Sequence, residues 1–258
     1  MPLETLAVAY LALVGLVVGS YLNVVIHRLP RGESTVLPRS RCPACGAAIR
    51  ARDNLPLVSW LLLGGRCRDC RAPIPFRYPL VEAAAAALFV ACYLRFGVSA
   101  DALAGIVFGC LLLALAGIDA AHLYLPDRLT LSGIAVGLAL QPWTTWGSLA
   151  QGIQGALLGG GLLLVLAGAW VLLRGREGMG LGDAKMLAMI GAFLGWRGVA
   201  VSLFAAAAAG AGTGLVLLAR RRGGWDLRLP FGVFLALGGL VALFWGRELV
   251  AAYARRLG

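Results

Sequence analysis

The chain has 258 residues, of which 60% are apolar and only 14% charged, and its mean hydropathy is +0.84. This composition lies outside the range of soluble globular domains and indicates a membrane protein with several spans. The net charge of +11 could indicate a nucleic-acid partner, but basic residues in a membrane protein mostly mark the loops that stay in the cytoplasm. We therefore expect the lipid bilayer as a partner, and no nucleic acid.

Eight apolar stretches approach the roughly 17 to 25 residues that a helix needs to cross a bilayer. They are residues 5–27, 80–97, 101–118, 129–146, 149–173, 184–196, 198–219 and 230–252. The runs are continuous and lack period-2 alternation, which favours helices over a barrel. The first stretch has neither a basic n-region nor a small-residue cleavage site, so it is predicted to be a retained helix. The fold class is thus an all-α polytopic membrane protein of about eight transmembrane helices.

Basic residues are unevenly divided between the two sides of this predicted topology. Eighteen of the 23 Lys and Arg fall in residues 28–79 and in the later loops on the same side, and five fall on the other side. This imbalance places residues 28–79 in the cytoplasm and both termini in the periplasm. The predicted domains are a first transmembrane helix (1–27), a small cytoplasmic module (28–79) and a seven-helix membrane domain (80–258).

The cytoplasmic module contains two C-x2-C pairs. Cys42, Cys45, Cys67 and Cys70 form the pattern C-x2-C-x21-C-x2-C, a spacing typical of a structural zinc site. Two disulfides or a dithiol redox centre are the alternatives, but a reducing compartment favours zinc. Four thiolates leave no open position for water, so the metal is predicted to be structural rather than catalytic.

An apolar run lies between the two cysteine pairs. The run "LPLVSWLLL" at residues 55–63 is too short to cross a bilayer and too apolar to be surrounded by water. We expect it to lie against the membrane surface or the helix ends and to dock the module there.

Two acids stand out because they are predicted to lie at span ends on the same side. Asp119 closes the third stretch, and Asp183 opens the sixth within "GMGLGD". Acids such as Asp53 and Asp101 lie in loops or at other span ends, where solvation explains them. Two neighbouring carboxylates in a low-dielectric site cannot both ionise cheaply, so one retains a proton. A charged and a protonated acid can together activate a water and polarise a peptide carbonyl.

Three further residues are candidates for positioning a substrate. Gly180 and Gly182 permit close backbone approach beside Asp183, and Glu82 is an acid just inside the second span. From the residues alone a protease, a proton-coupled transporter and a structural role all remain open. A transporter predicts inverted repeats and broken helices, and we see neither in the sequence. A membrane-anchored zinc module that only binds partners would leave the acids without a role.

The motifs, taken together and in order, resemble the type IV prepilin peptidase family, the bacterial inner-membrane aspartic proteases with a G-x-G-D motif that also act as N-methyltransferases. The stretches that carry the resemblance are "GSYLNVVIHRLP", "CPAC", "CRDC", "NLPLVSWLLLGG", "RYPLVE", "IDAAHLYLPDRLT", "GMGLGDAKMLAMIGAFLGW" and "LPFGVFLALGG". The resemblance implies that Asp119 and Asp183 are catalytic. Family members often have a second acid where this chain has Ala121, so the resemblance leaves Asp119 as the acid at that site.

The resemblance also implies the substrates and a second reaction. The expected substrates are prepilins of type IV pili and pseudopilins of type II secretion, whose short basic leader is cut after a glycine. The new N-terminus is then methylated, with S-adenosyl-L-methionine as methyl donor. The sequence contains no G-x-G-x-x-G after a strand, so no Rossmann-type site for the donor is predicted.

Overall fold

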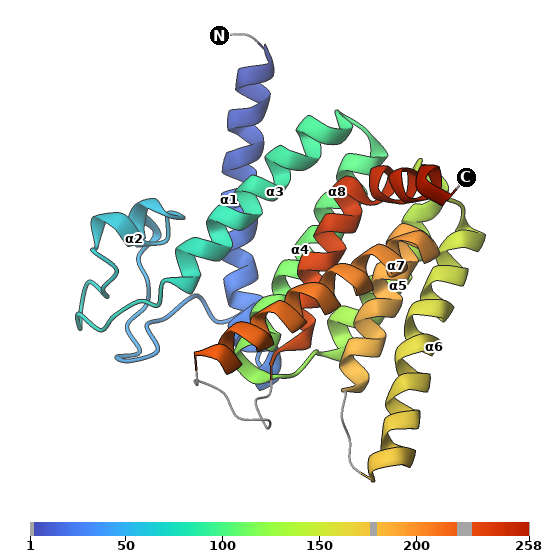
Figure 1. Cartoon of the computed structure of the whole chain (residues 1–258). Helices are drawn as coiled ribbons and strands as arrows, with labels where there is room; N and C mark the ends of the chain where they lie inside the picture. The colour runs from blue at the N-terminus through green and yellow to red at the C-terminus, as the bar shows by residue number, and fades with distance from the viewer. Residues whose placement is uncertain (1–2, 176–179, 221–228, 258) are drawn as a thin grey trace. The chain divides into compact units, whose positions relative to one another are not determined.

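A computed structural model describes residues 3–175, 180–220 and 229–257 of the chain. All regular elements among these residues are helices, which confirms the predicted fold class. The chain, drawn in Figure 1, divides into two compact units, residues 1–98 and residues 99–258.

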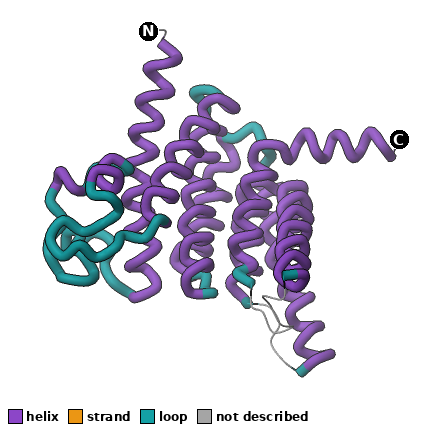
Figure 2. Tube along the Cα trace, turned by 60° about the vertical axis from the view of Figure 1, so that its left-hand side comes forward, coloured by secondary structure: helices purple, strands orange, loops and turns teal. Residues whose placement is uncertain are grey.

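The first unit is a pair of long helices with a small module between them. Helix α1 (Leu3–Arg28) and helix α3 (Arg77–Phe96) pack closely at Gly15. A Cβ on this residue would lie only 2.6 Å from the Ala86 Cα, so the close approach needs a glycine there. The intervening residues form loops, two 3-10 turns, η1 (Leu29–Arg31) and η2 (Ala51–Asp53), and the short helix α2 (Val58–Leu62). Figure 2 shows this loop-rich module beside the two helices.

The second unit contains the remaining long helices. These are α4 (Ala100–His122), α5 (Asp127–Leu140), the 3-10 turn η3 (Gln141–Trp143), α6 (Leu149–Arg174), α7 (Leu181–Ala219) and α8 (Phe231–Leu257). Helix α4 begins after Ser99, whose hydroxyl accepts a hydrogen bond from the Ala102 N–H at 3.2 Å. It ends at His122, and the capping residue Leu123 adopts a left-handed conformation with φ of 51°. The chain then turns sharply, and this turn brings Leu125 into the core, where it is 5% exposed.

Helix α7 is interrupted in its middle at Gly195, where φ is 67° and ψ is −175°. The break frees backbone carbonyls of the preceding turn, and the Gln141 side chain pairs with two of them. Its Nε2 donates to the Ala192 carbonyl at 2.9 Å and to the Phe193 carbonyl at 2.8 Å. A broken helix was not apparent in the sequence, so that part of the argument against a transporter was wrong. The break nevertheless lies about 18 Å along the helix from Asp183, at 1.5 Å of rise per residue.

Each of the eight expected stretches overlaps a helix, but in the described part of the chain six helices are long and apolar enough to cross a membrane. The difference has two causes. Residues 184–196 and 198–219 share the single kinked helix α7. Helix α5 has 14 residues and is therefore only about 21 Å long, which is shorter than the hydrocarbon core of a bilayer.

Two acids that we expected to be solvated are held by the protein. Asp101 is 9% exposed, and its two carboxylate oxygens accept hydrogen bonds from the backbone N–H and the hydroxyl of Thr145, both at 2.7 Å. The Asp53 side chain is also 9% exposed and forms an ion pair with Arg68. Solvation was therefore the wrong explanation for both, since each acid fastens a loop to a neighbouring segment.

Candidate active site and metal centre

Asp119 lies in the last turn of α4 and is 5% exposed. Its carboxylate faces the beginning of α8, where its Oδ2 accepts a hydrogen bond from the Val233 N–H at 3.3 Å. The Gly232 N–H is also directed at this carboxylate. A helix N-terminus carries a partial positive charge, so α8 stabilises a negative charge on Asp119. The approach depends on a glycine, because a Cβ at position 232 would lie 2.8 Å from Oδ2.

Asp183 lies in the first turn of α7 and is half-buried. Gly180 is the residue that caps this helix, and its backbone N–H is directed at the Asp183 carboxylate. The Asp183 N–H in turn donates to the Gly180 carbonyl at 3.1 Å. Gly178 and Met179, which belong to the same glycine-rich motif, lie outside the described residues. Asp183 is therefore held at the end of α7 by the turn that starts the helix.

Leu125 connects the surroundings of the two acids. A Cβ on Gly182, next to Asp183, would lie 2.9 Å from the Leu125 Cβ. A Cβ on Gly232, which faces Asp119, would lie 3.2 Å from the Leu125 Cδ1. The two carboxyl groups also interact electrostatically. The end of α4 and the beginnings of α7 and α8 thus meet around one leucine, with one acid on each of the first two helices.

The turn after α4 also contacts α7 through an ion pair. Lys185 Nζ lies 2.6 Å from Asp127 Oδ1, and both side chains are partly exposed. This pair joins the start of α5 to the first turn of α7 and leaves Asp183 without a cationic partner from Lys185. Ala121, where the family often has a second acid, is exposed. Because it is two residues after Asp119 on the same helix, it points to another side of α4.

The four cysteines of the module are brought together. Their Sγ atoms all lie within 4.8 Å of one another, and those of Cys42 and Cys70 are 3.8 Å apart. Four sulfurs at about 2.3 Å from a tetrahedral zinc would be separated by about 3.8 Å, so the cluster fits zinc. The Cys45 N–H is directed at the Cys42 sulfur and is the main cause that lowers the pKa of that thiol to about 7.

The two cysteine pairs form similar knuckles. The Cys42 N–H donates to the Ala47 carbonyl at 2.9 Å, and the Cys67 N–H donates to the Ala72 carbonyl at 2.8 Å. The residue after each second cysteine has a positive φ, which is 73° at Gly46 and 61° at Arg71. Each knuckle therefore presents its two sulfurs on one side of a tight turn, as a shared ion requires.

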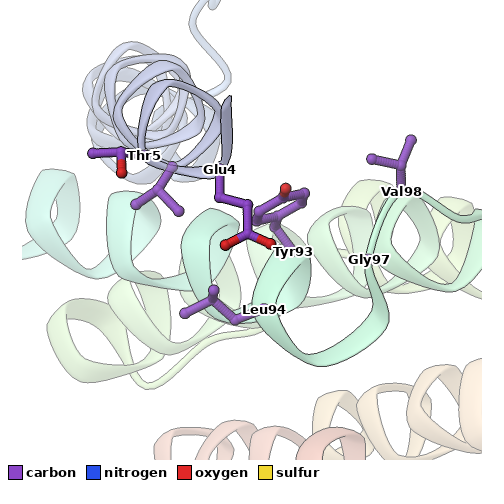
Figure 3. Close-up of a pocket in the computed structure, with 7 residues that line it drawn as sticks. Glu4, Thr5, Tyr93, Leu94, Gly97 and Val98 are labelled. Carbon is purple, nitrogen blue, oxygen red and sulfur yellow. The ribbon is translucent and has the colours of Figure 1, made fainter. Parts of the chain in front are cut away.

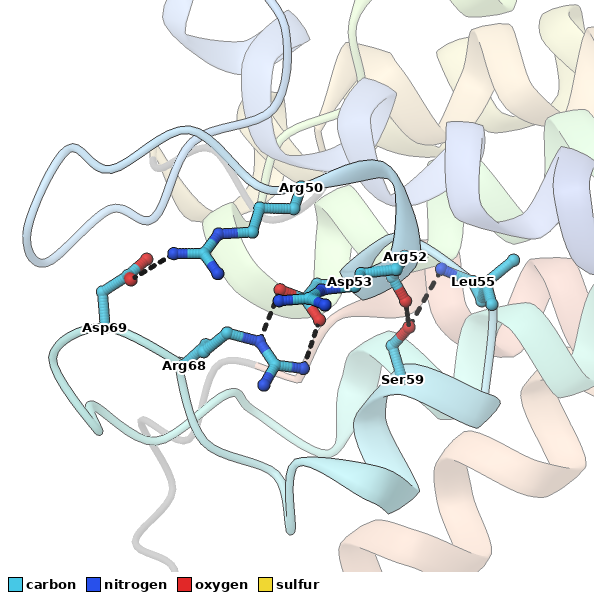
Figure 4. Close-up of polar contacts among 7 residues, drawn as sticks. All are labelled: Arg50, Arg52, Asp53, Leu55, Ser59, Arg68 and Asp69. Atoms are coloured by element: carbon cyan, nitrogen blue, oxygen red, sulfur yellow. Dashed lines mark hydrogen bonds and ion pairs between the residues drawn. The ribbon is translucent and has the colours of Figure 1, made fainter.

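Ion pairs connect the knuckles to the segment between them (Figure 4). Arg68 donates from Nε and Nη2 to the two oxygens of Asp53 at 2.8 and 2.6 Å. Arg50 and Asp69 form a second, exposed pair at 3.4 Å. The hydrogen bonds from Arg68 hold the pKa of the Asp53 carboxyl below its ordinary value.

Glu82 is buried in the first unit and has protein partners. Its Oε2 accepts a hydrogen bond from the Leu57 N–H at 2.8 Å, and the Ser20 hydroxyl also interacts with the carboxylate. Leu57 has an unusual backbone conformation, with φ of 59° and ψ of −50°. Glu82 therefore holds the turn before α2 against α3. Its role in positioning a substrate stays a prediction, as do those of Gly180 and Gly182.

A pocket of about 550 Å³ opens at the far end of the first helix pair, where α1 begins and α3 ends (Figure 3). It is lined by Glu4, Thr5, Val8, Tyr93, Leu94, Gly97 and Val98. This pocket contains one acid, whereas the hydrolytic site considered above needs two. It is therefore not a candidate for that site.

Sequence reasoning found both acids and all four cysteines but missed the contribution of α8. The Asp119 carboxylate is bound by backbone N–H groups, which carry no side-chain signature. The signal available was Pro230 directly before the helix, in "LPFG", because proline is common at the start of a helix. That signal predicts where α8 begins, but it does not predict that the helix points at Asp119.

Comparisons with known proteins agree with these features. A model of the bacterial peptidase A24 N-terminal domain matches residues 13–96, and a model of the type IV leader peptidase family matches residues 106–215. A protein of Burkholderia pseudomallei (strain 1026b) is 43% identical over 92% of this chain and 85% of its own length. A protein of Stutzerimonas stutzeri is 39% identical over 98% of this chain and 97% of its own length. Both are named prepilin leader peptidase/N-methyltransferase. No solved structure matches the chain.

Fold and site together define an all-helical, multi-pass membrane protein with two acids at adjoining helix ends and a four-cysteine cluster that could hold a metal. The chain belongs to the type IV leader peptidase family. The family assignment confirms the resemblance seen in the motifs, and it identifies the chain as a peptidase of the leader-cleaving class.

Proposed function

We propose that this chain cleaves the short basic leader of type IV prepilins and pseudopilins after glycine and then methylates the new N-terminus from S-adenosyl-L-methionine. Asp119 and Asp183 are the catalytic residues. The observation that carries the proposal is that the end of α4, which carries Asp119, and the beginning of α7, which carries Asp183, meet around Leu125. Methyl transfer rests on the names of the relatives, and we assign no residue to the methyl donor.

The surroundings of the two acids suggest different roles for them. Asp119 accepts hydrogen bonds from N–H groups at the positive end of α8. It is therefore the charged acid of the pair, and it takes the proton from the attacking water. Asp183 carries the shared proton and donates a hydrogen bond to the scissile carbonyl. The water adds to the carbonyl carbon, and the tetrahedral intermediate collapses as a proton passes to the leaving amine. The leader carboxylate and the mature pilin amine are the products.

The position of the acids suits a substrate that is itself in the membrane. Asp119 is three residues from the end of α4, and Asp183 is the third residue of α7, so each lies within about 5 Å of a helix end. A pilin's apolar segment would lie in the bilayer, with its leader junction at this depth. We place the protein in the bacterial inner membrane, with the active site and module in the cytoplasm and both termini in the periplasm.

Zinc is the metal that we assign to the module. Cys42, Cys45, Cys67 and Cys70 would hold it as thiolates, and the ion would stabilise the fold of a module too small for a large core. A closed four-sulfur shell binds no water, so the metal takes no part in cleavage. Gly180 and Gly182 are proposed to position the peptide near the acids, and Glu82 is proposed to receive its basic leader.

The test is cleavage of a purified prepilin by the full-length protein in detergent or nanodiscs. Asp119→Asn and Asp183→Asn should each lose cleavage by about 10²–10⁴-fold, the usual contribution of a general acid or base. Asp101→Asn is the matched control, because Asp101 is an acid at the opposite end of α4 that only binds Thr145. If either variant at 119 or 183 cleaves as well as Asp101→Asn does, the proposed mechanism is wrong.

A further inference from the structure

Helix α2 and the residue run before it expose large apolar side chains although they belong to the module. Leu61 is 70% exposed, Leu62 is 81% exposed and Leu55 is 52% exposed. The polar groups around Ser59 are bonded within the module. The Ser59 hydroxyl donates to the Arg52 carbonyl at 3.0 Å and accepts from the Leu55 N–H at 3.0 Å. A segment with satisfied polar groups and outward leucines is suited to lipid rather than to water.

The aromatic side chain of Trp60 fixes the orientation of α2. The Trp60 Nε1 donates to the Ile74 carbonyl at 3.2 Å, and its ring meets the Phe76 ring edge-on at 5.8 Å. These contacts turn Trp60 toward the second knuckle. The leucines that follow Trp60 on the helix therefore point away from the knuckle.

The depth of α2 along the helix pair is set by Glu82. The Leu57 N–H, directly before α2, bonds to the Glu82 carboxylate at 2.8 Å. Glu82 is five residues after the start of α3, or about 7.5 Å along it. It also packs against Gly19, where a Cβ would lie 2.7 Å from the Glu82 Cα. Gly19 is nine residues before the end of α1, or about 13 Å along that helix.

Helix α2 therefore begins beside the helix pair rather than beyond its end. Figures 1 and 2 both show α2 alongside α1, well above the last turn of that helix. Because α1 and α3 are both long and apolar enough to span a membrane, a segment at this height lies at the depth of the membrane interface. Its exposed leucines face outward from the helix pair at that depth.

We infer that α2 is a membrane-inserted segment whose leucines lie among the acyl chains of anionic phospholipids. The charge of the module selects this kind of lipid. Residues 28–79 contain ten arginines but only three acids, Glu33, Asp53 and Asp69. Two of these acids already pair with arginines. A basic segment next to a membrane is attracted to anionic headgroups. The bilayer would thus anchor the module at a third place, besides α1 and α3.

The experiment is photo-crosslinking of the full-length protein in nanodiscs of phosphatidylethanolamine and phosphatidylglycerol. The variants are Leu62→p-benzoylphenylalanine and, as a second position, Leu61→p-benzoylphenylalanine. Val165→p-benzoylphenylalanine, on a 70% exposed site in α6, is the positive control for lipid contact. Ala48→p-benzoylphenylalanine is the negative control, because Ala48 is exposed on the first knuckle and lies outside its C-x2-C pair. An unchanged melting temperature and a monodisperse size-exclusion profile show that each variant is folded.

Lipid adducts at positions 61 and 62, as at position 165 and in contrast to position 48, are the expected result. Replacing phosphatidylglycerol by phosphatidylcholine should reduce the yield at 61 and 62 but leave it unchanged at 165. Absence of lipid adducts at both α2 positions would overturn the inference, as would adducts with prepilin or with a second copy of the chain in their place. An unchanged yield without anionic lipid would overturn the selection by charge. The proposed catalysis is independent of all these outcomes.

Discussion

Gly232→Ala tests whether the start of α8 holds Asp119 for catalysis. The added Cβ would lie 2.8 Å from the Asp119 Oδ2 and 3.2 Å from the Leu125 Cδ1. A carbon and an oxygen in favourable contact are about 3.3–3.6 Å apart, so the carboxylate must move by about 0.5 Å or more. This movement lengthens the 3.3 Å hydrogen bond from the Val233 N–H and shifts the base relative to the attacking water.

The expected loss follows from that displacement. A hydrogen bond to a charged group contributes about 1.5–3 kcal/mol, and each 1.36 kcal/mol corresponds to about tenfold in rate. Gly232→Ala should therefore slow prepilin cleavage by about 10–100-fold in a single-turnover assay. Gly246→Ala is the matched control on the same helix, because a Cβ there would have an ordinary contact of 3.7 Å with the Ala242 Cβ. Equal cleavage rates for the two variants would refute the role given to α8.

Three further predictions concern the metal, the helix break and the module's ion pair. The purified protein should contain one zinc per chain by elemental analysis, and Cys45→Ser should lose it together with hydrogen-exchange protection of the module, whereas retention of stoichiometric zinc would contradict the assignment. Gln141→Leu should lower the melting temperature, since each buried carbonyl that loses its partner costs about 1–3 kcal/mol, and Gln151→Leu at an exposed site should not. Because the folded-state pKa of Asp53 is depressed, the stability from its pair with Arg68 is present above the carboxyl's ordinary pKa and is lost as pH falls through the depressed value. Arg68→Ala should consequently destabilise the module at pH 7 in the wild-type background but have little effect in an Asp53→Asn background, and an equal effect in both would show that the ion pair is not its cause.

The sequence predicts the helical membrane fold and the identity of the site residues because those features have local signals. Long apolar runs predict spans, and the C-x2-C pairs at residues 42–45 and 67–70 predict a four-sulfur cluster. Asp119 and Asp183 are conspicuous because acids are costly beside a membrane. Each of these inferences needs only residue type and spacing.

The remaining features depend on contacts between distant segments, which spacing does not reveal. Gly195 looks like many other glycines in apolar helices, and only the approach of Gln141, from the 3-10 turn η3, shows where α7 breaks. Asp101 has the sequence context of a solvated helix start, yet Thr145 reaches it from 44 residues away. The hydrogen bond from the Leu57 N–H to Glu82 is likewise invisible in the sequence, because its donor is backbone.

The central claim is that Asp119 and Asp183 act as one unit that shares a proton, and a double-mutant cycle in single-turnover cleavage tests it most directly. Residues that act as a unit are not additive in their effects. Asp119→Asn, Asp183→Asn and the double variant should therefore lose cleavage to the same extent. If the double variant instead shows the product of the two separate losses, the acids act independently and the claim fails.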